Sequence, residues 1–249
     1  MSLWRLERIR LLRTPRWAGL LASYLVFGIG MPILTRYQEA LFRNVGGEVR
    51  VIASPPTPSQ AIGAYLSNAM QIGLLVSVLV AAGSLAFDAK PEWAAFLRTR
   101  SPSLGALLVP KVATNAIAVG ASYAAGLLSA WVGTAALIGS IPPAAILVGG
   151  LYGILYLGFA VAAVAPAAAV ARSVIGAGGL ALALLIVLPI VGQAVPSAEP
   201  WLPSALVGAP TAIVDGQGAW SFLRAVGVVA VLTPAMLSAA ERLLARREV

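Results

Sequence analysis

The chain has 249 residues, of which 59% are hydrophobic and only 10% are charged, whereas soluble domains carry about 25% charged residues. This composition predicts an integral membrane protein with one transmembrane domain over residues 1–249. The sequence has no Cys and no His, which excludes thiol and imidazole catalysis and the usual zinc and haem ligands. It also lacks a glycine-rich phosphate loop, so we expect no catalytic residues, no metal and no cofactor in this chain.

The net charge of +8 has two interpretations. Basic residues can contact nucleic acid, but in a membrane protein they mark cytoplasmic loops and bind anionic lipids. We therefore expect membrane lipids, and no nucleic acid, among the partners.

Residues 1–16 are rich in Arg and Leu and predict a helix in the membrane interface, with its arginines extended toward water. Six segments are apolar and long enough to span a bilayer, at 17–35, 62–87, 112–138, 144–171, 173–195 and 220–240. Prolines at the end of segment 36–61 predict an ordered or extended loop there rather than a helix. Residues 196–219 are too rich in proline to span, and predict short re-entrant helices in the outer leaflet.

Most Lys and Arg residues fall on one side of this arrangement. That side holds Arg5, Arg8, Arg10, Arg13, Arg16, Lys90, Arg98, Arg100, Lys111, Arg172, Arg242, Arg246 and Arg247. The other side holds Arg36, Arg43 and Arg50, with Arg224 near the outer end of the sixth span. The positive-inside rule predicts a multi-pass protein of the inner (plasma) membrane with both termini in the cytoplasm.

The most informative segment lies between the second and third spans, where six ionisable side chains occur from Asp88 to Lys111. Burying each would cost about 2.5–3.5 kcal/mol, so we expect this segment outside the hydrocarbon. A proline in the first turn and a Ser-Pro stop predict a short helix over 88–102, with Trp93 and Phe96 on one face. The pattern fits a surface helix in lipid headgroups and, equally, a docking helix that another protein grips.

In the order of these features, the chain resembles the membrane subunit of a type-2 ABC exporter, a bacterial permease with six spans. The resemblance covers nearly the full length and depends on residues 4–17, on Glu92 to Lys111, and on Trp201-Leu-Pro-Ser204. It implies that 1–16 is a connecting helix and 88–102 a coupling helix. It also implies that a second copy or a sister permease completes the pore. Separate ABC ATPase subunits would bind ATP and Mg²⁺ and push the coupling helix through Glu92, Trp93, Phe96, Arg98 and Arg100.

Polar side chains within the spans are few, and they are candidates for lining a translocation pathway: Tyr65, Asn68, Gln71, Asn115, Tyr123, Tyr152 and Tyr156. The alternative role is hydrogen bonding between helices, worth about 0.6–2 kcal/mol each. The apolar and aromatic character of these candidates favours a hydrophobic or amphipathic cargo, such as a drug, an antibiotic, a lipid or a peptide.

Two other functions fit the same hydropathy. An ion-coupled secondary transporter would lack a proton relay, since no Asp, Glu or His is expected well inside a span, although sodium coupling through backbone carbonyls stays open. A non-transporting scaffold or assembly protein would need no helix fixed between the second and third spans. The sequence therefore favours an exporter permease that is not itself an enzyme.

Overall fold

The computed structural model describes residues 3–44, 55–86, 104–171 and 173–246. Within these ranges every regular element is a helix, which confirms the predicted all-α fold. In the described part of the chain, six helical segments are long and apolar enough to cross a membrane, as the hydropathy predicts. They are formed by α2 (Arg16–Asn44); by α3 (Pro58–Asn68), η1 (Ala69–Gly73) and α4 (Leu74–Leu85) in succession; by α6 (Leu104–Leu137), α7 (Pro143–Val170) and α8 (Val174–Ala194); and by α10 (Leu223–Ala245).

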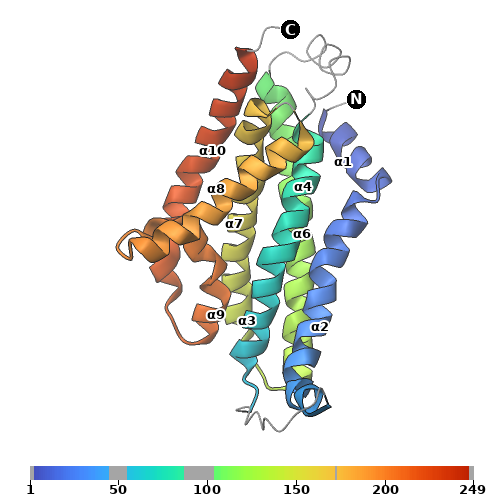
Figure 1. The fold of residues 1–249 in the computed structure, drawn as a ribbon, viewed down its shortest axis with the longest axis vertical. Helices are drawn as coiled ribbons and strands as arrows, with labels where there is room; N and C mark the ends of the chain where they lie inside the picture. Colours follow the sequence, from blue (N-terminus) through green and yellow to red (C-terminus); the bar gives the residue numbers. More distant parts are fainter. Residues whose placement is uncertain (1–2, 45–54, 87–103, 172, 247–249) are drawn as a thin grey trace.

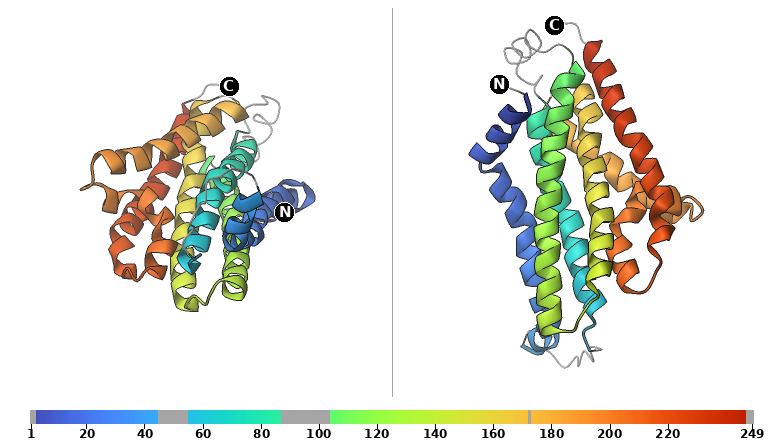
Figure 2. Two further views of the ribbon diagram at one scale, coloured as in Figure 1. Left: turned by 60° about the horizontal axis from the view of Figure 1, so that its bottom comes forward. Right: turned by 180° about the vertical axis from the view of Figure 1, so that it is seen from behind.

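The spans form an elongated bundle in which most helices follow the long axis (Figure 1). α6 packs against α2 and α7, and α7 packs in turn against α10, α8 and α4. α8 crosses the bundle obliquely (Figures 1 and 2). The N-terminal helix α1 (Leu3–Arg13) is separated from α2 by a short turn, and it leans away from the α2 axis.

One end of the bundle holds α1, the end of α4, the start of α6 and the end of α10, and we call it the terminal end (Figure 1). Both described ends of the chain therefore lie on the same side of the bundle, as the distribution of Lys and Arg predicts. The predicted coupling helix at 88–102 lies outside the described residues, but both helices that flank it reach the terminal end. The cytoplasmic orientation of this end stays a prediction.

Several helix boundaries differ from the sequence prediction, among them one in each of the first three spans. α2 continues through Asn44, so the prediction of a non-helical segment from residue 36 was wrong for its first part. Those residues contain no Gly or Pro that would end the helix. α3 begins at Pro58, where Thr57 forms a capping box with Gln60 and proline occupies the first turn. The third span begins earlier than predicted, because α6 includes Lys111.

Residues 196–219 contain short helical elements, as predicted. They are η3 (Glu199–Trp201), η4 (Pro203–Val207), α9 (Ala209–Val214) and the start of η5 (Ala219–Phe222). η4 and α9 pack against α7, and Leu206 and Ala209 are fully buried there. Gly149 of α7 allows this contact, since a side chain at that position would collide with Pro210. Entry of this region into the outer leaflet stays a prediction.

α7 lies at the centre of the core. Every residue from 160 to 169 except Pro166 is buried, and these residues are Ala, Val and Pro. Small side chains let neighbouring helices approach closely, which is the usual way that membrane helices gain packing energy. The core is thus held by close contact between helices, and polar groups enter it at only a few places among the described residues.

Candidate functional site: a buried polar network at the terminal end

A buried ion pair joins the N-terminal helix to the third span. The Nζ atom of Lys111, on α6, donates to the Oε1 atom of Glu7, on α1, over 2.5 Å. The two side chains are only 3% and 9% exposed. An unpaired charge at this depth would cost several kcal/mol, so each side chain depends on the other to be tolerated there.

Local structure brings the two charges together. The chain turns at Thr14, whose hydroxyl donates to the Leu11 carbonyl over 3.1 Å, and Pro15 follows. This turn lets α1 pack against α6 as well as α2. Glu7 is the only acidic residue in α1, and it faces inward while the arginines of the same helix are exposed. The helix is therefore oriented by its single carboxylate.

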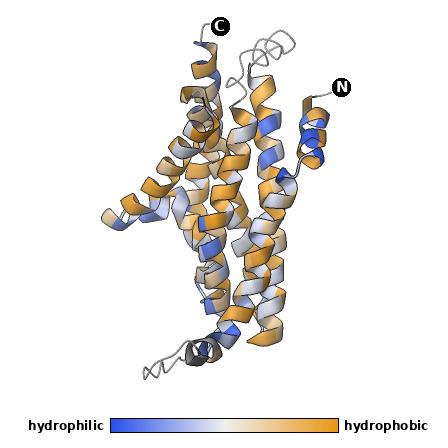
Figure 3. Ribbon diagram, turned by 45° about the vertical axis from the view of Figure 1, so that its right-hand side comes forward, coloured by the Kyte–Doolittle hydropathy of each residue, from blue (hydrophilic) through white to orange (hydrophobic). Residues whose placement is uncertain are grey.

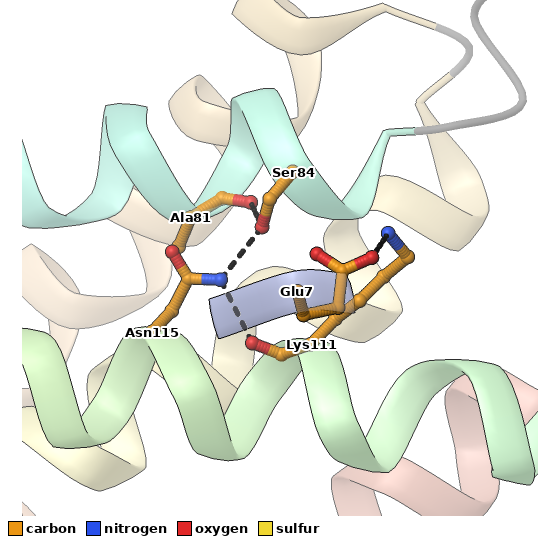
Figure 4. A network of polar contacts seen from close by, with 5 residues as sticks. All are labelled: Glu7, Ala81, Ser84, Lys111 and Asn115. Atoms are coloured by element: carbon orange, nitrogen blue, oxygen red, sulfur yellow. Dashed lines mark hydrogen bonds and ion pairs between the residues drawn. The ribbon is translucent and has the colours of Figure 1, made fainter. Parts of the chain in front are cut away.

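Asn115 extends the network from α6 to α4. Its Nδ2 atom donates to the Ser84 hydroxyl over 2.8 Å and to the Lys111 carbonyl over 2.7 Å. The Ser84 hydroxyl donates in turn to the Ala81 carbonyl over 3.0 Å (Figure 4). We call Glu7, Ser84, Lys111 and Asn115 the polar network. It ties α1, the last turns of α4 and the first turns of α6 into one unit.

A small cavity adjoins the polar network. Its volume is about 10 Å³, and Glu7, Ser84, Asn115 and two arginines, Arg10 and Arg16, are among the residues that line it. The Asn115 Oδ1 atom has no hydrogen-bond partner among the described residues. A cavity of this size holds about one water molecule. One water there would satisfy the amide oxygen.

The burial of Lys111 was not anticipated, and its position relative to the hydrocarbon stays a prediction. The sequence places it with the charged segment outside the hydrocarbon, whereas the structure buries it in α6 to 2% exposure. The physical reason is the pairing with Glu7, which a count of charges along one segment does not reveal. The predicted coupling residues Glu92, Trp93, Phe96, Arg98 and Arg100 lie outside the described residues.

Two of the predicted pathway residues belong to a buried tyrosine cluster. Tyr24, Tyr65 and Tyr123 are fully buried where α2, α3 and α6 meet. The Tyr65 hydroxyl donates to the Tyr123 carbonyl over 3.0 Å, and the Tyr24 and Tyr123 rings meet edge to face at 5.9 Å. The Tyr24 hydroxyl is 3.0 Å from the Ser77 hydroxyl. These contacts fit the alternative role, in which polar groups hold helices together.

Glycines make room for this cluster. A Cβ atom at Gly126 would lie 2.7 Å from the Tyr24 carbonyl oxygen and 2.7 Å from the Tyr65 hydroxyl oxygen. A Cβ atom at Gly73 would lie 2.6 Å from the Tyr24 ring. Side chains larger than hydrogen would push the rings apart, so the three tyrosines are tightly packed in the core of the described bundle.

The other pathway candidates are spread over the bundle. Asn68 is half-buried, and its Nδ2 atom donates to the Ala64 carbonyl over 2.9 Å. Tyr152 donates to the Ala219 carbonyl over 2.8 Å, which ties α7 to the region before the last span. Tyr156 is buried, and the centroid of its ring lies 6.5 Å from the centroid of the Phe159 ring.

Gln71 differs from the other candidates because it is exposed. It lies in η1, a π-helical turn between α3 and α4, and its Nε2 atom donates to the Ser67 hydroxyl over 3.4 Å. A π-helical turn within a span often occurs at functional positions. Of the seven candidates, Gln71 is the one whose amide is presented on the outer surface of the single chain.

Sequence reasoning missed Glu7, Ser84 and Tyr24. A signal for the first was present, since a lone acid in an arginine-rich helix needs a reason to be there. Lys111 and Asn115 are also four residues apart and share one face of a helix. Nothing in the sequence indicated that the α1 face and this α6 face would meet.

Comparison with protein-family models, with curated proteins and with solved structures gives no match to this chain. Its function is therefore argued from its own residues.

Proposed function

We propose that this chain is the membrane-spanning permease subunit of an ATP-driven exporter of the type-2 ABC class. The proposal begins from the order of the segments, which resembles that of a type-2 ABC exporter permease. Six candidate spans, and two chain ends at one end of the bundle, support it. In this proposal a partner ATPase binds ATP and Mg²⁺, and this chain performs no chemistry of its own.

The observation that carries the proposal is the polar network. Segment 88–102 is flanked by α4 and α6, and the network joins both of these helices to α1. A push on this segment would move α4 and α6 directly and would move α1 through the Lys111–Glu7 ion pair. An exporter needs such a connection, because ATP binding must shift several spans together to change which side of the pore is open.

We further propose that a second copy, or a sister permease, completes the pathway. The tyrosine candidates are packed inside this chain, whereas Gln71 is exposed and available to a neighbouring subunit. A hydrophobic or amphipathic cargo is supported by an apolar groove of about 820 Å³ between α6, α7 and α10. Drugs, antibiotics, lipids and peptides are cargo classes of this chemical character.

Site-specific cross-linking tests the proposed ATPase contact. The natural chain contains no Cys, so Phe96→Cys introduces a single reactive thiol into segment 88–102. The chain should be purified with its native membrane complex and treated with a short thiol-to-amine cross-linker. The proposal predicts a covalent product between Phe96→Cys and a nucleotide-binding ATPase, with less product when ATP and vanadate lock the ATPase.

Trp220→Cys is the matched control. Trp220 is 81% exposed and is predicted on the opposite side of the membrane, so its thiol should form no product with the ATPase. Equal products from both variants would mean non-specific contact. A complex that contains no ATPase would contradict the proposal.

One observation keeps an ion-coupled transporter as the second candidate. Lys111 and Glu7 place two ionisable groups inside the protein, which the sequence did not predict. Flux driven by an ion gradient through the purified chain alone, with loss of that flux in Glu7→Gln, would favour this candidate over the exporter.

A further inference from the structure

A groove between the N-terminal helix and the bundle has the polarity of a phospholipid. It has a volume of about 690 Å³ and lies between α1, the start of α2 and the middle of α6. Arg5 and Arg8 line it on the α1 side, and Ile117 and Ala121 form part of its floor on α6. The groove shares no residue with the polar network, but Ile117 and Ala121 also line the groove of about 820 Å³ between α6, α7 and α10.

The charged side of the groove is suited to an anion. Arg5 and Arg8 are three residues apart, so they share one face of α1, and both are exposed. Among the described residues that line the groove, none is acidic. Glu7, which separates the two arginines in sequence, faces away and is neutralised by Lys111. The two guanidinium groups therefore keep their charge available, and guanidinium binds phosphate oxygens in a bidentate manner.

The opposite side of the groove is suited to an acyl chain. Ile117 is 69% exposed although it belongs to a candidate span, so its side chain is available to a hydrocarbon ligand. Two tryptophans, Trp4 and Trp17, also line the groove and are 50% and 43% exposed. Tryptophan is enriched at the level of lipid headgroups. In Figure 3 hydrophilic residues are concentrated on α1, whereas hydrophobic and intermediate residues predominate along the neighbouring spans.

We propose that this groove binds one phospholipid with a net negative headgroup, such as phosphatidylglycerol. The headgroup phosphate lies between Arg5 and Arg8, and the first part of an acyl chain lies along Ile117 and Ala121. A zwitterionic lipid is the poorer occupant, because its ammonium group meets two arginines and no carboxylate among the described residues of the groove. The bound lipid fills the space between α1 and α6 and so holds α1 against the bundle.

Native mass spectrometry of the full-length protein tests the site. The chain should be purified from nanodiscs of phosphatidylcholine that contain a minority of phosphatidylglycerol, and the retained lipids should be counted. We expect one retained phosphatidylglycerol and a clear preference over phosphatidylcholine. Arg5→Ala/Arg8→Ala removes the charge-assisted hydrogen bonds to the headgroup phosphate, so it should lower the preference by about ten-fold or more.

Arg13→Ala/Arg246→Ala is the control, because it removes the same charge from exposed sites outside the groove at the terminal end. It should keep the preference, and an equal loss in both double variants would overturn the proposal in favour of general surface attraction. Ala121→Phe keeps the charge but fills the apolar floor, and it should also release the lipid. Retention of the lipid in Ala121→Phe would overturn the proposal.

The source of the phosphate group is tested in the same samples. Addition of inorganic phosphate to the purified protein should not displace the lipid and should not raise Tm in lipid-free detergent. If inorganic phosphate stabilises the protein as well as phosphatidylglycerol does, the groove is a site for a small anion and the proposal fails. Retention of phosphatidylcholine and phosphatidylglycerol in proportion to their supply would also contradict it.

Discussion

Because the Glu7–Lys111 ion pair is buried, we expect the loss of one charge to affect stability more than the loss of both. Glu7→Met leaves the Lys111 ammonium buried without its carboxylate, and Lys111→Met leaves the Glu7 carboxylate buried without its ammonium. Either change should destabilise the protein strongly. Glu7→Met/Lys111→Met replaces both charges with apolar side chains of similar volume, and such replacements of buried pairs are often neutral or stabilising.

The expected loss in the free energy of unfolding follows from how little the two side chains are exposed. Both side chains are less than a tenth exposed, so removal of one partner should lower the free energy of unfolding by about 3–5 kcal/mol. In a chain of about this size 1 kcal/mol corresponds to about 2–4 °C, so Tm should fall by about 6–20 °C. The double variant should recover most of that loss. Thermal unfolding of the purified chain, followed by circular dichroism and by tryptophan fluorescence, measures all four proteins.

Glu199→Met is the matched control, because Glu199 is exposed and its replacement should change stability by less than about 0.5 kcal/mol. The reasoning is refuted if the single variants are no less stable than this control. It is also refuted if the double variant loses as much stability as the two single variants added together, since the two charges would then not be coupled.

Three further predictions concern the core. Gly126→Ala should cost about 1–3 kcal/mol in unfolding free energy because its Cβ atom meets the buried tyrosines, whereas Gly158→Ala has open space and should be neutral or stabilising. Tyr65→Phe should cost about 0.6–2 kcal/mol, whereas Tyr123→Phe should cost less, because the Tyr123 hydroxyl has no hydrogen-bond partner among the described residues. Asn115→Leu should cost about 1–3 kcal/mol through two lost hydrogen bonds, and a cost below about 0.5 kcal/mol would contradict the network. Thermal unfolding of each variant beside the natural chain measures these differences in stability.

Hydropathy was sufficient to predict the spans, because a bilayer imposes one length and one polarity on every helix that crosses it. The fifth and sixth spans, at 173–195 and 220–240, agree with α8 and α10 closely at one end or both. The same rule failed at the ends of other helices. α2 continues to Asn44 because nothing in residues 36–44 breaks a helix once it leaves the apolar region.

The candidate site was less predictable, since it depends on which helix faces meet. The sequence placed Lys111 in a solvated segment, whereas the structure pairs it with Glu7 of α1. Tyr65 and Tyr123 were predicted as pathway residues or as hydrogen-bonding contacts between helices, and the tyrosine cluster with its glycines fits the second role. Pairings of this kind are set by tertiary contacts, which periodicity along one segment cannot report.

ATP-driven transport by the reconstituted complex tests the exporter proposal most directly. Vesicles containing this chain and its co-purified ATPase should hydrolyse ATP and export an amphipathic probe. Glu92→Ala and Phe96→Ala should reduce both activities together, whereas Glu199→Ala, an exposed acid outside segment 88–102, should leave them unchanged. Export that needs no ATPase, or ATP-driven export that is unaffected by both segment variants, would contradict the account.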